Sequence, residues 1–314
     1  MKNVKTIDLF AGIGGVRLAF EKAGFNTVFA NDFEPKCAET YDLNFNSVKL
    51  TIKDIKEIEI EKLPNFNLLL GGFPCQPFSI AGRREGMEDE RGTLFFEISK
   101  ILEERRPVGF FLENVKNLTG HNFGKTFKVI LNKLDILGYD IKYAVLNSME
   151  YGNIPQNRER VYIVGFLRET NLIKKFDFPS SMELKISIKD ILETEVSDIY
   201  YYNNKPLFEQ LKRFTFKENI IYQWRRKYVR ENKSGVCPTL TANMGTGGHN
   251  VPLIKDQKGI RKLTPRECAR IQGFPNTYKL PKIADSSLYK QIGNSVSVPV
   301  VYRIAKNMMT ALSN

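Results

Sequence analysis

Short apolar runs alternate with segments of helical period along the first 166 residues of the chain. The apolar runs predict buried strands at residues 4–10, 27–30, 68–70, 108–112, 143–146 and 161–166. The segments between them predict helices at residues 16–22, 34–44, 93–105 and 125–137. Strands that alternate with helices are typical of a parallel sheet covered by helices. This part of the chain therefore predicts a doubly wound, Rossmann-like α/β domain.

The pattern changes after residue 166. Residues 167–260 are rich in Lys, Asn, Tyr and Ile without a steady period, which predicts a smaller domain, mostly irregular or β. A helix is expected after Thr264, because Thr264 suits the N-cap, Pro265 the first helical position and Glu267 the capping box. A last apolar-faced helix at residues 298–312 is expected to pack on the α/β body. We expect one domain from residues 1–166 and 286–314, and another from residues 167–285.

The composition is that of a globular protein. Hydrophobic residues make up 42% and charged residues 26% of the 314 residues, which excludes a disordered or collagen-like chain. No apolar run reaches the roughly 18 residues of a membrane span, and the first residues contain no signal-peptide core, so a cytoplasmic protein is expected. Neither a disulfide framework nor a metal site is expected, because no CxxC pair occurs among Cys37, Cys75, Cys237 and Cys268 and the chain has 2 histidines.

The charge balance suggests a polyanionic partner. The chain has 47 Lys and Arg residues against 35 Asp and Glu residues, a formal net charge of +12. Nucleic acid fits this charge, although many basic proteins carry only a solvated basic face. Charge alone therefore leaves both interpretations open.

A glycine loop follows the first predicted strand, within Asp8 to Gly15. A strand end, a glycine turn and a helix N-terminus form the usual cofactor-binding place in a doubly wound sheet. The dinucleotide fingerprint would need a third glycine at Arg17, so an adenosyl cofactor fits better. Asp32 ends the second strand, where it can accept hydrogen bonds from ribose hydroxyls, and Phe33 can stack on adenine. The alternative is a tight turn and a helix-capping aspartate.

A cysteine loop follows the strand at residues 68–70. Glycine and proline residues, including Pro74, fix this loop, and Cys75 should emerge at the carboxyl edge of the sheet. Cysteine is the best side-chain nucleophile at neutral pH, whereas Cys37 and Cys268 are expected to be buried structural residues. Glu113 ends another strand at the same edge and can act as an acid or cap the next helix.

Two arginines precede the last strand of this half. Arg158 and Arg160 face the same way if the segment is extended, and both can meet an anion or a base carbonyl. A surface ion pair with Glu159 is the ordinary alternative. The pattern itself does not choose between these roles.

In this order the motifs resemble those of bacterial DNA (cytosine-5) methyltransferases of the restriction-modification type. The resemblance covers both ends of the chain and is interrupted by a variable insert between Phe166 and Arg261. It is carried by residues 8–15, 31–33, 54–55, 72–76, 113–115, 156–160, 261–275 and 291–296.

The resemblance implies S-adenosylmethionine as the methyl donor, S-adenosylhomocysteine as the product, and no metal. It implies that Cys75, beside Pro74, attacks C6 of a cytosine flipped out of duplex DNA, that Glu113 acts at N3, and that Arg158, and secondarily Arg160, reaches the cytosine carbonyl. The implied cofactor-binding residues are Phe10, Ala11, Gly12, Gly14, Gly15, Asp32, Phe33, Asp54, Ile55 and Asn294. Residues 80–91, with Arg83 and Arg84, match a mobile loop that closes over the target base.

The insert is the candidate DNA-reading segment. Residues 205–233 contain nine Lys and Arg residues against three Asp and Glu residues, interleaved with aromatic residues. This pattern suits contacts to phosphates or to guanine, and the alternative is a basic solvated face over an aromatic core. The candidate contact residues are Arg225, Arg226, Lys227, Arg230, Thr239 and Leu240.

Residues 1–166 and 286–314 are therefore expected to form the catalytic and cofactor-binding domain, and residues 167–285 the target-recognition domain, of a monomer. A restriction endonuclease is a possible functional partner. A tRNA cytosine-5 methyltransferase of the same superfamily would share the fold, but the long basic insert argues against it. A nicotinamide oxidoreductase would leave Cys75 and Glu113 unexplained, and an inactive DNA-binding module would not need them.

Overall fold

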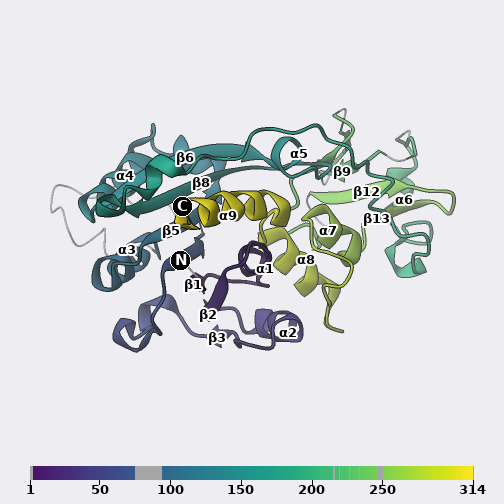
Figure 1. The fold of residues 1–314 in the computed structure, drawn as a ribbon. Coiled ribbons are helices and arrows are strands. Elements are labelled where there is room, and N and C mark those ends of the chain that lie inside the picture. Colours follow the sequence, from purple (N-terminus) through teal and green to yellow (C-terminus); the bar gives the residue numbers. More distant parts are fainter. Residues whose placement is uncertain are drawn as a thin grey trace, which may run out of the picture. The chain divides into compact units, whose positions relative to one another are not determined.

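The computed structural model describes residues 3–74, 94–214, 216–218, 220–225, 227–232, 234–245 and 250–313. The chain, drawn as a ribbon in Figure 1, forms two compact units. Unit 1 contains residues 1–146, 159–180 and 301–314, and unit 2 contains residues 147–158 and 181–300.

The core of unit 1 is a seven-stranded sheet with the order β3-β2-β1-β4-β5-β8-β6. Its strands are β1 (Lys5–Leu9), β2 (Asn26–Asp32), β3 (Thr51–Ile52), β4 (Leu68–Gly72), β5 (Gly109–Val115), β6 (Tyr139–Asn147) and β8 (Glu159–Leu167). β1 lies between β2 and β4, the switch point at which doubly wound sheets bind ligands. Strands β1 to β5 pair in parallel, which confirms the doubly wound prediction for this part.

The sheet is mixed rather than wholly parallel, because β8 pairs antiparallel with β5. The sequence could not show this direction. A strand buried on both faces has the same continuous apolar run whichever way it points. The expectation of a wholly parallel sheet is therefore wrong at β8.

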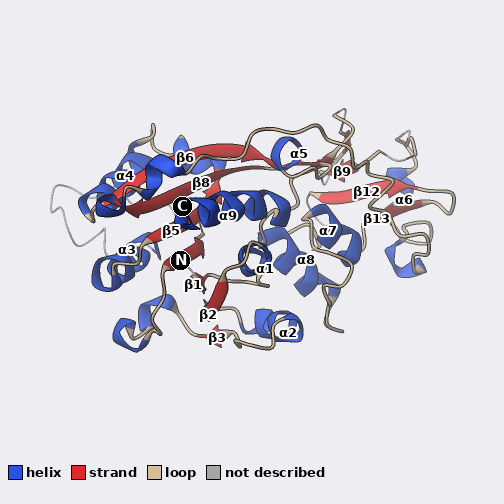
Figure 2. Ribbon diagram, in the orientation of Figure 1, coloured by secondary structure: helices blue, strands red, loops and turns tan. Residues whose placement is uncertain are grey.

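Helices cover both faces of the sheet (Figure 2). On one face, Phe110 and Leu112 of β5 share a buried cluster with residues of α3 and α4, including Ile98 and Ile130. On the other face, Phe111 packs against Phe20 of α1 with 5.2 Å between ring centroids. The helices are α1 (Gly15–Lys22), α2 (Pro35–Asn44), α3 (Leu94–Arg105), α4 (Lys125–Ile136) and α9 (Val298–Ser313), which begins in unit 2.

These elements confirm the helices and strands expected in the first half of the chain and the closing helix. Short 3₁₀ helices, which were not predicted, cover Ile55–Glu57, Ile60–Lys62, Lys116–Thr119, Arg168–Thr170, Leu172–Lys175 and Asp198–Tyr200. In the part of the chain that the structure describes, no helix has both the length and the apolar character to cross a membrane.

Unit 2 has its own small antiparallel sheet, with the order β10-β9-β12-β13. One face of this sheet packs into a second buried cluster with Tyr222, Trp224, Val251 and Leu253. The strands of this sheet are β9 (Tyr222–Trp224), β10 (Val229–Glu231), β12 (Val251–Lys255) and β13 (Ile260–Lys262). A separate two-stranded sheet is formed by β7 (Gln156–Asn157) and β11 (Cys237–Pro238). The helices are α5 (Ser148–Tyr151), α6 (Phe208–Leu211), α7 (Pro265–Ile271) and α8 (Asp285–Asn294).

Helix α7 begins as predicted. The Thr264 hydroxyl accepts a hydrogen bond from the Glu267 backbone N–H, and the Glu267 carboxylate accepts one from the Thr264 N–H. The capping box expected from the sequence is therefore confirmed.

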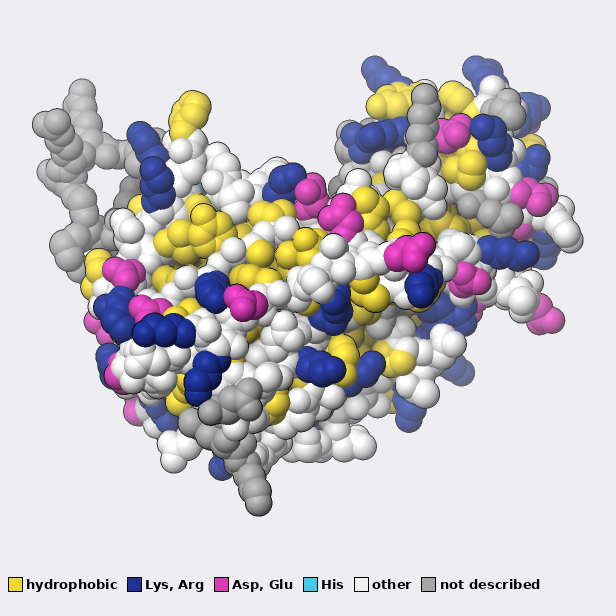
Figure 3. Space-filling model, turned by 45° about the horizontal axis from the view of Figure 1, so that its top comes forward, with side chains coloured by type: hydrophobic (Ala, Val, Ile, Leu, Met, Phe, Trp, Pro, Cys, Tyr) yellow, Lys and Arg dark blue, Asp and Glu magenta, His cyan; other side chains and the backbone are white. Residues whose placement is uncertain are grey.

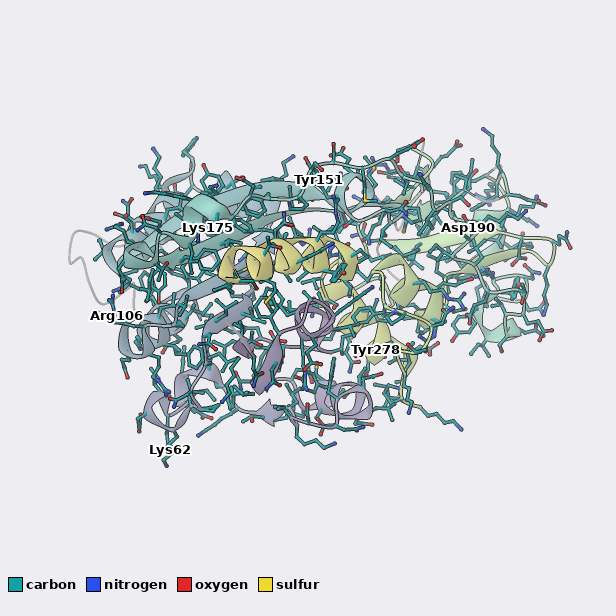
Figure 4. The ribbon with its side chains drawn as sticks, viewed as in Figure 1. Lys62, Arg106, Tyr151, Lys175, Asp190 and Tyr278 are labelled. Atoms are coloured by element: carbon teal, nitrogen blue, oxygen red, sulfur yellow. The ribbon has the colours of Figure 1, made fainter. Side chains whose placement is uncertain are left out.

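The compact units differ from the expected domains at three segments. Residues 167–180 belong to unit 1, where Phe176 contacts Phe166 and Lys142 Nζ donates to the Phe176 carbonyl over 2.5 Å. Lys175, labelled in Figure 4, lies in this segment. Residues 147–158 and 286–300 belong to unit 2. Loss of a regular period at residue 167 marks an irregular segment rather than the end of the compact unit.

Candidate active site

The glycine loop lies between β1 and α1, at the switch point of the sheet. Three of its residues have positive φ: Phe10 (55°), Gly12 (53°) and Gly14 (77°). The Ala11 N–H donates to the Asn31 carbonyl over 2.9 Å, which ties the loop to the end of β2. The loop is thus a fixed turn that presents backbone at the carboxyl edge of the sheet.

Asp32 is bound directly to this loop. Its Oδ2 accepts a hydrogen bond from the Gly12 N–H at 2.8 Å and its Oδ1 accepts one from the Glu34 N–H at 2.9 Å. Burial raises the pKa of Asp32, and these N–H donors oppose that rise. Phe33, the next residue, is 67% exposed, a large apolar ring facing solvent beside a buried carboxyl group.

Asp54 and Ile55 follow β3 in the same unit. The Lys53 N–H donates to the Asp32 carbonyl over 3.0 Å, so this segment begins beside Asp32. Asp54 Oδ1 accepts from the Lys56 N–H and caps a short 3₁₀ helix, while Ile55 is buried in the core. The structure therefore brings the loop, Asp32 and Asp54 to one end of β1, β2 and β3.

A buried carboxyl group lies in β1 just before the loop. Asp8 is fully buried, and this burial raises the pKa of its carboxyl group to about 8, against the opposing effect of Arg17. Sequence reasoning gave Asp8 no separate role. The sequence feature that could have indicated a special role is an acidic residue inside an otherwise apolar strand.

Glu113 and Arg160 form an ion pair in unit 1. Arg160 Nε lies 3.2 Å from Glu113 Oε1, and the side chains are 13% and 10% exposed. Register explains the contact: Glu113 lies opposite Tyr162 and Val115 opposite Arg160 in the β5–β8 ladder. The two side chains therefore meet across neighbouring strands at the carboxyl end of β5.

The same end of β5 adjoins the segment that leads to Cys75. Gly72 pairs with Glu113 in the β4–β5 ladder, and Asn114 Nδ2 donates to the Phe73 carbonyl over 2.9 Å. Pro74 is exposed and is the last described residue before the gap. Cys75, Arg83, Arg84 and the expected loop at residues 80–91 lie outside the described residues.

Arg158 has different partners from Arg160. It is 2% exposed, and its guanidinium group donates to the carbonyl oxygens of Leu240 at 2.9 Å and Ser295 at 2.6 Å, and to that of Gly293. The Arg158 N–H donates to the Gln156 carbonyl, so the segment turns instead of running straight into β8. The expectation that both arginines face the same way is corrected by this turn.

Two of the expected DNA-contact residues lie next to Arg158. The Leu240 N–H donates to Gln156 Oε1 at 3.0 Å, and the Leu240 side chain is only 2% exposed. The Thr239 hydroxyl donates to the Asn157 carbonyl over 2.7 Å. Asn294 is exposed, and its neighbours Gly293 and Ser295 both accept from Arg158. Within unit 2 these hydrogen bonds link residues 156–158 to residues 239–240 and 293–295.

The basic stretch divides into an aromatic core and a basic exterior. Phe216, Tyr222 and Trp224 lie in the buried cluster of unit 2, whereas Lys227 and Arg230 are exposed. Arg225 Nη1 donates to Asn250 Oδ1 over 2.5 Å, and Arg226 lies outside the described residues. The alternative that these aromatic residues form a core beneath the basic residues is therefore confirmed for Phe216, Tyr222 and Trp224.

The other cysteines and the acidic residues show no metal chemistry in the described chain. Cys37 and Cys268 are buried as expected, and Cys237 is buried as well. Burial raises the pKa of the Cys237 and Cys268 thiols, which keeps them protonated. Among the residues that the structure describes, no group of three or more His, Cys, Asp or Glu side chains is arranged to hold a metal ion.

Comparisons with known proteins identify the family of this chain. Residues 4–310 match the family model described as C-5 cytosine-specific DNA methylase. The chain is 54% identical to the type II methyltransferase M.Bsp6I of Bacillus sp. (strain RFL6), over 97% of this chain and 98% of that protein. It is 38% identical to the type II methyltransferase M.HhaI of Haemophilus parahaemolyticus, over 100% of this chain and 96% of that protein.

Solved structures show the same fold. The methyltransferase EhMeth of Entamoeba histolytica superposes with a TM-score of 0.77 at 23% identity and covers 100% of both chains. The Dnmt2 methyltransferase of S. pombe superposes with a TM-score of 0.76 at 22% identity, over 99% of this chain and 100% of that one. With a family model that spans nearly its whole length and a relative at 54% identity, the chain belongs to the C-5 cytosine-specific DNA methylases.

Proposed function

We propose that this DNA cytosine-5 methyltransferase acts on a cytosine flipped out of a short specific duplex sequence, through a covalent bond between Cys75 and C6 of the base. The observation that carries the site assignment is the Glu113–Arg160 pair, with 3.2 Å between Nε and Oε1, at the strand end beside the segment leading to Cys75. Flipping is required because a base inside a duplex cannot reach a nucleophile on the protein.

The chemistry requires each of these groups. Cytosine C5 is a weak nucleophile until the Cys75 thiolate adds to C6 and places negative charge on the ring. A Glu113 carboxyl group at N3 and the Arg160 guanidinium group at the neighbouring carbonyl oxygen would offset that charge. C5 then takes the methyl group, a base removes the C5 proton, and the electron pair of that bond expels the Cys75 thiolate. The position of Arg160 favours it over Arg158 for the carbonyl contact.

S-adenosylmethionine supplies the electrophilic methyl group when bound and leaves as S-adenosylhomocysteine. The residues at the end of β1 and β2 fit it. Both Asp32 oxygens accept backbone N–H groups, and the carboxylate can still accept a hydrogen bond from a ribose hydroxyl, because its two oxygens together offer about four lone-pair sites; the exposed Phe33 ring offers a face for adenine. We assign the cofactor contacts to Phe10, Ala11, Gly12, Gly14, Gly15, Asp32, Phe33, Asp54, Ile55 and Asn294, and no metal to the reaction.

The relatives support a wider role. Both M.Bsp6I and M.HhaI are named type II methyltransferases. We propose that the protein likewise modifies host DNA in the cytoplasm as a monomer, functionally paired with a restriction endonuclease. The tRNA alternative is less favoured, because both relatives are named type II methyltransferases and are 54% and 38% identical to this chain.

The test is to incubate the purified protein with S-adenosylmethionine carrying a labelled methyl group, separately on unmethylated DNA and on tRNA. Base-resolution sequencing then locates the product. We expect 5-methylcytosine in one recurring DNA motif, loss of turnover in Cys75→Ser, and retained turnover in the matched control Cys37→Ala. Label confined to tRNA would replace the proposed substrate. Turnover retained in Cys75→Ser would remove the covalent mechanism.

A further inference from the structure

The small sheet of unit 2 has two faces of different character. Directly opposed residues of an antiparallel sheet point to the same face. One face carries Tyr222, Trp224 and Leu253, which belong to the buried cluster. The register pairs Gln223 with Arg230 on β10 and with Pro252 on β12, so these three residues share the opposite face.

The polar face continues beyond the strand ends. Counting on from the register of β9 with its two neighbours places Arg225 opposite both Tyr228 and Asn250. Two hydrogen bonds support this: the Arg225 N–H donates to the Tyr228 carbonyl at 2.9 Å, and Arg225 Nη1 donates to Asn250 Oδ1 at 2.5 Å. Arg225, Tyr228 and Asn250 therefore stand side by side at the tip of the β9–β10 hairpin.

This polar face is covered over the central strands, whereas the edge strand β10 and the hairpin tip are accessible. Gln223 and Pro252 are buried, whereas Arg230 is exposed and Tyr228 is 51% exposed. Tyr228 thus differs from Tyr222 and Trp224, whose rings lie in the core. Figure 3 shows Lys and Arg side chains gathered over unit 2, at the right of the view. The accessible tip combines positive charge with one outward aromatic ring.

We propose that this tip reads the DNA sequence, with Arg225 hydrogen-bonded to the O6 and N7 atoms of a guanine, Asn250 as its positioning residue, and Tyr228 in contact with the adjoining base pair. An arginine paired with guanine needs its planar fork held in one orientation, which a hydrogen bond to an amide oxygen provides. A phosphate contact needs only charge and tolerates a mobile lysine. The proposal rests on the proposed function and predicts a guanine within the recognised motif.

The test compares full-length wild type with Arg225→Lys, Asn250→Ala and Tyr228→Ala on a library of randomised duplexes. Arg225→Lys keeps the charge and the alkyl chain but loses the fork. We expect it to lower kcat/KM on the wild-type motif by about 5- to 150-fold, equivalent to 1–3 kcal/mol. The loss should appear as tolerance of other bases at one guanine position. Asn250→Ala should relax the same position to a smaller degree, and Tyr228→Ala the adjoining one.

Lys227→Ala is the matched control, because this exposed neighbour is expected to contact a phosphate. It should weaken DNA binding equally for all sequences and reduce the salt slope by about 0.9. The same behaviour in a folded Arg225→Lys, or its retention of the full motif, would overturn the base contact. Equal melting temperatures and equal cofactor affinity exclude misfolding as the cause. If the wild type methylates no DNA, the proposed function fails. If the wild type methylates a DNA motif and the variants keep its full specificity, only the inference fails.

Discussion

Arg160 on β8 and Glu113 on β5 meet as an ion pair, with 3.2 Å between Nε and Oε1 and little exposure of either side chain. Neither residue needs this contact for the sheet to form, since the ladder between the two strands is made by backbone atoms. Two opposite charges held together at a strand end can present an acid and a cation to one planar base.

Glu113→Gln is expected to lower kcat by about 10²- to 10⁴-fold, because the amide cannot supply a proton to N3 of the base. The amide keeps the shape of the side chain but removes the negative charge beside Arg160, so the melting temperature is also expected to fall. The half-exposed Glu159, which pairs with Lys116 at 2.9 Å, provides the control Glu159→Gln, with kcat unchanged. Single-turnover kinetics with excess enzyme measures the chemical step. Equal rates for the two variants would remove Glu113 from the chemistry.

Arg158 is expected to stabilise unit 2 through its buried hydrogen bonds. Arg158→Ala would remove the donor from the carbonyls of Leu240, Gly293 and Ser295 within unit 2. Charged hydrogen bonds contribute about 1.5–3 kcal/mol each, so unfolding in urea should show a loss of several kcal/mol. The control is Arg168→Ala, whose ion pairs with Asp135 and Asp140 are half exposed and should therefore contribute little to stability. Equal losses in the two variants would contradict the role assigned to Arg158.

Arg158 and Arg160 also show what the sequence could and could not predict. Their spacing of two residues predicts side chains on the same side of an extended segment. The chain turns at Arg158 instead, and the two arginines have different partners. The seven-residue β2 and twelve-residue α4 were predictable, because each is long enough to show its period. The three-residue strands β9 and β10 are too short for that. Pairing between distant segments is set by tertiary packing.

Asp8 should make stability depend on pH. Burial raises the pKa of its carboxyl group from 3.8 to about 8 in the folded protein. The folded state therefore holds this proton to higher pH than the unfolded chain. Below about pH 4 Asp8 is protonated in both states and does not affect the pH dependence. As the pH rises from about 4 toward 8, the free energy of unfolding falls.

Asp8→Asn cannot lose this proton. Its stability relative to the wild type should rise between about pH 4 and 8, by at most about 1.4 kcal/mol per pH unit. Urea unfolding of both proteins at several pH values measures the difference, in which the other titrating groups cancel. Parallel pH profiles for the two proteins would show that Asp8 is ionised in the fold.

Gly12 and Gly14 offer a matched pair within the cofactor loop. Both have positive φ, so alanine at either position costs about 1 kcal/mol from the backbone alone. A Cβ atom on Gly14 would lie 2.3 Å from the Phe45 ring, and the repacking this forces should add about 1–3 kcal/mol. Apart from Gly12 itself and its two chain neighbours, no atom of the described residues lies within 4 Å of a Cβ atom on Gly12.

The open space above Gly12 is where the proposed cofactor would approach the backbone. Gly12→Ala should therefore leave unfolding within about 1 kcal/mol of the wild type but weaken S-adenosylmethionine binding, measured by calorimetry. Gly14→Ala should mainly lower the melting temperature. If Gly12→Ala binds the cofactor as tightly as the wild type, the methyl group meets nothing there, and the cofactor does not contact this part of the loop.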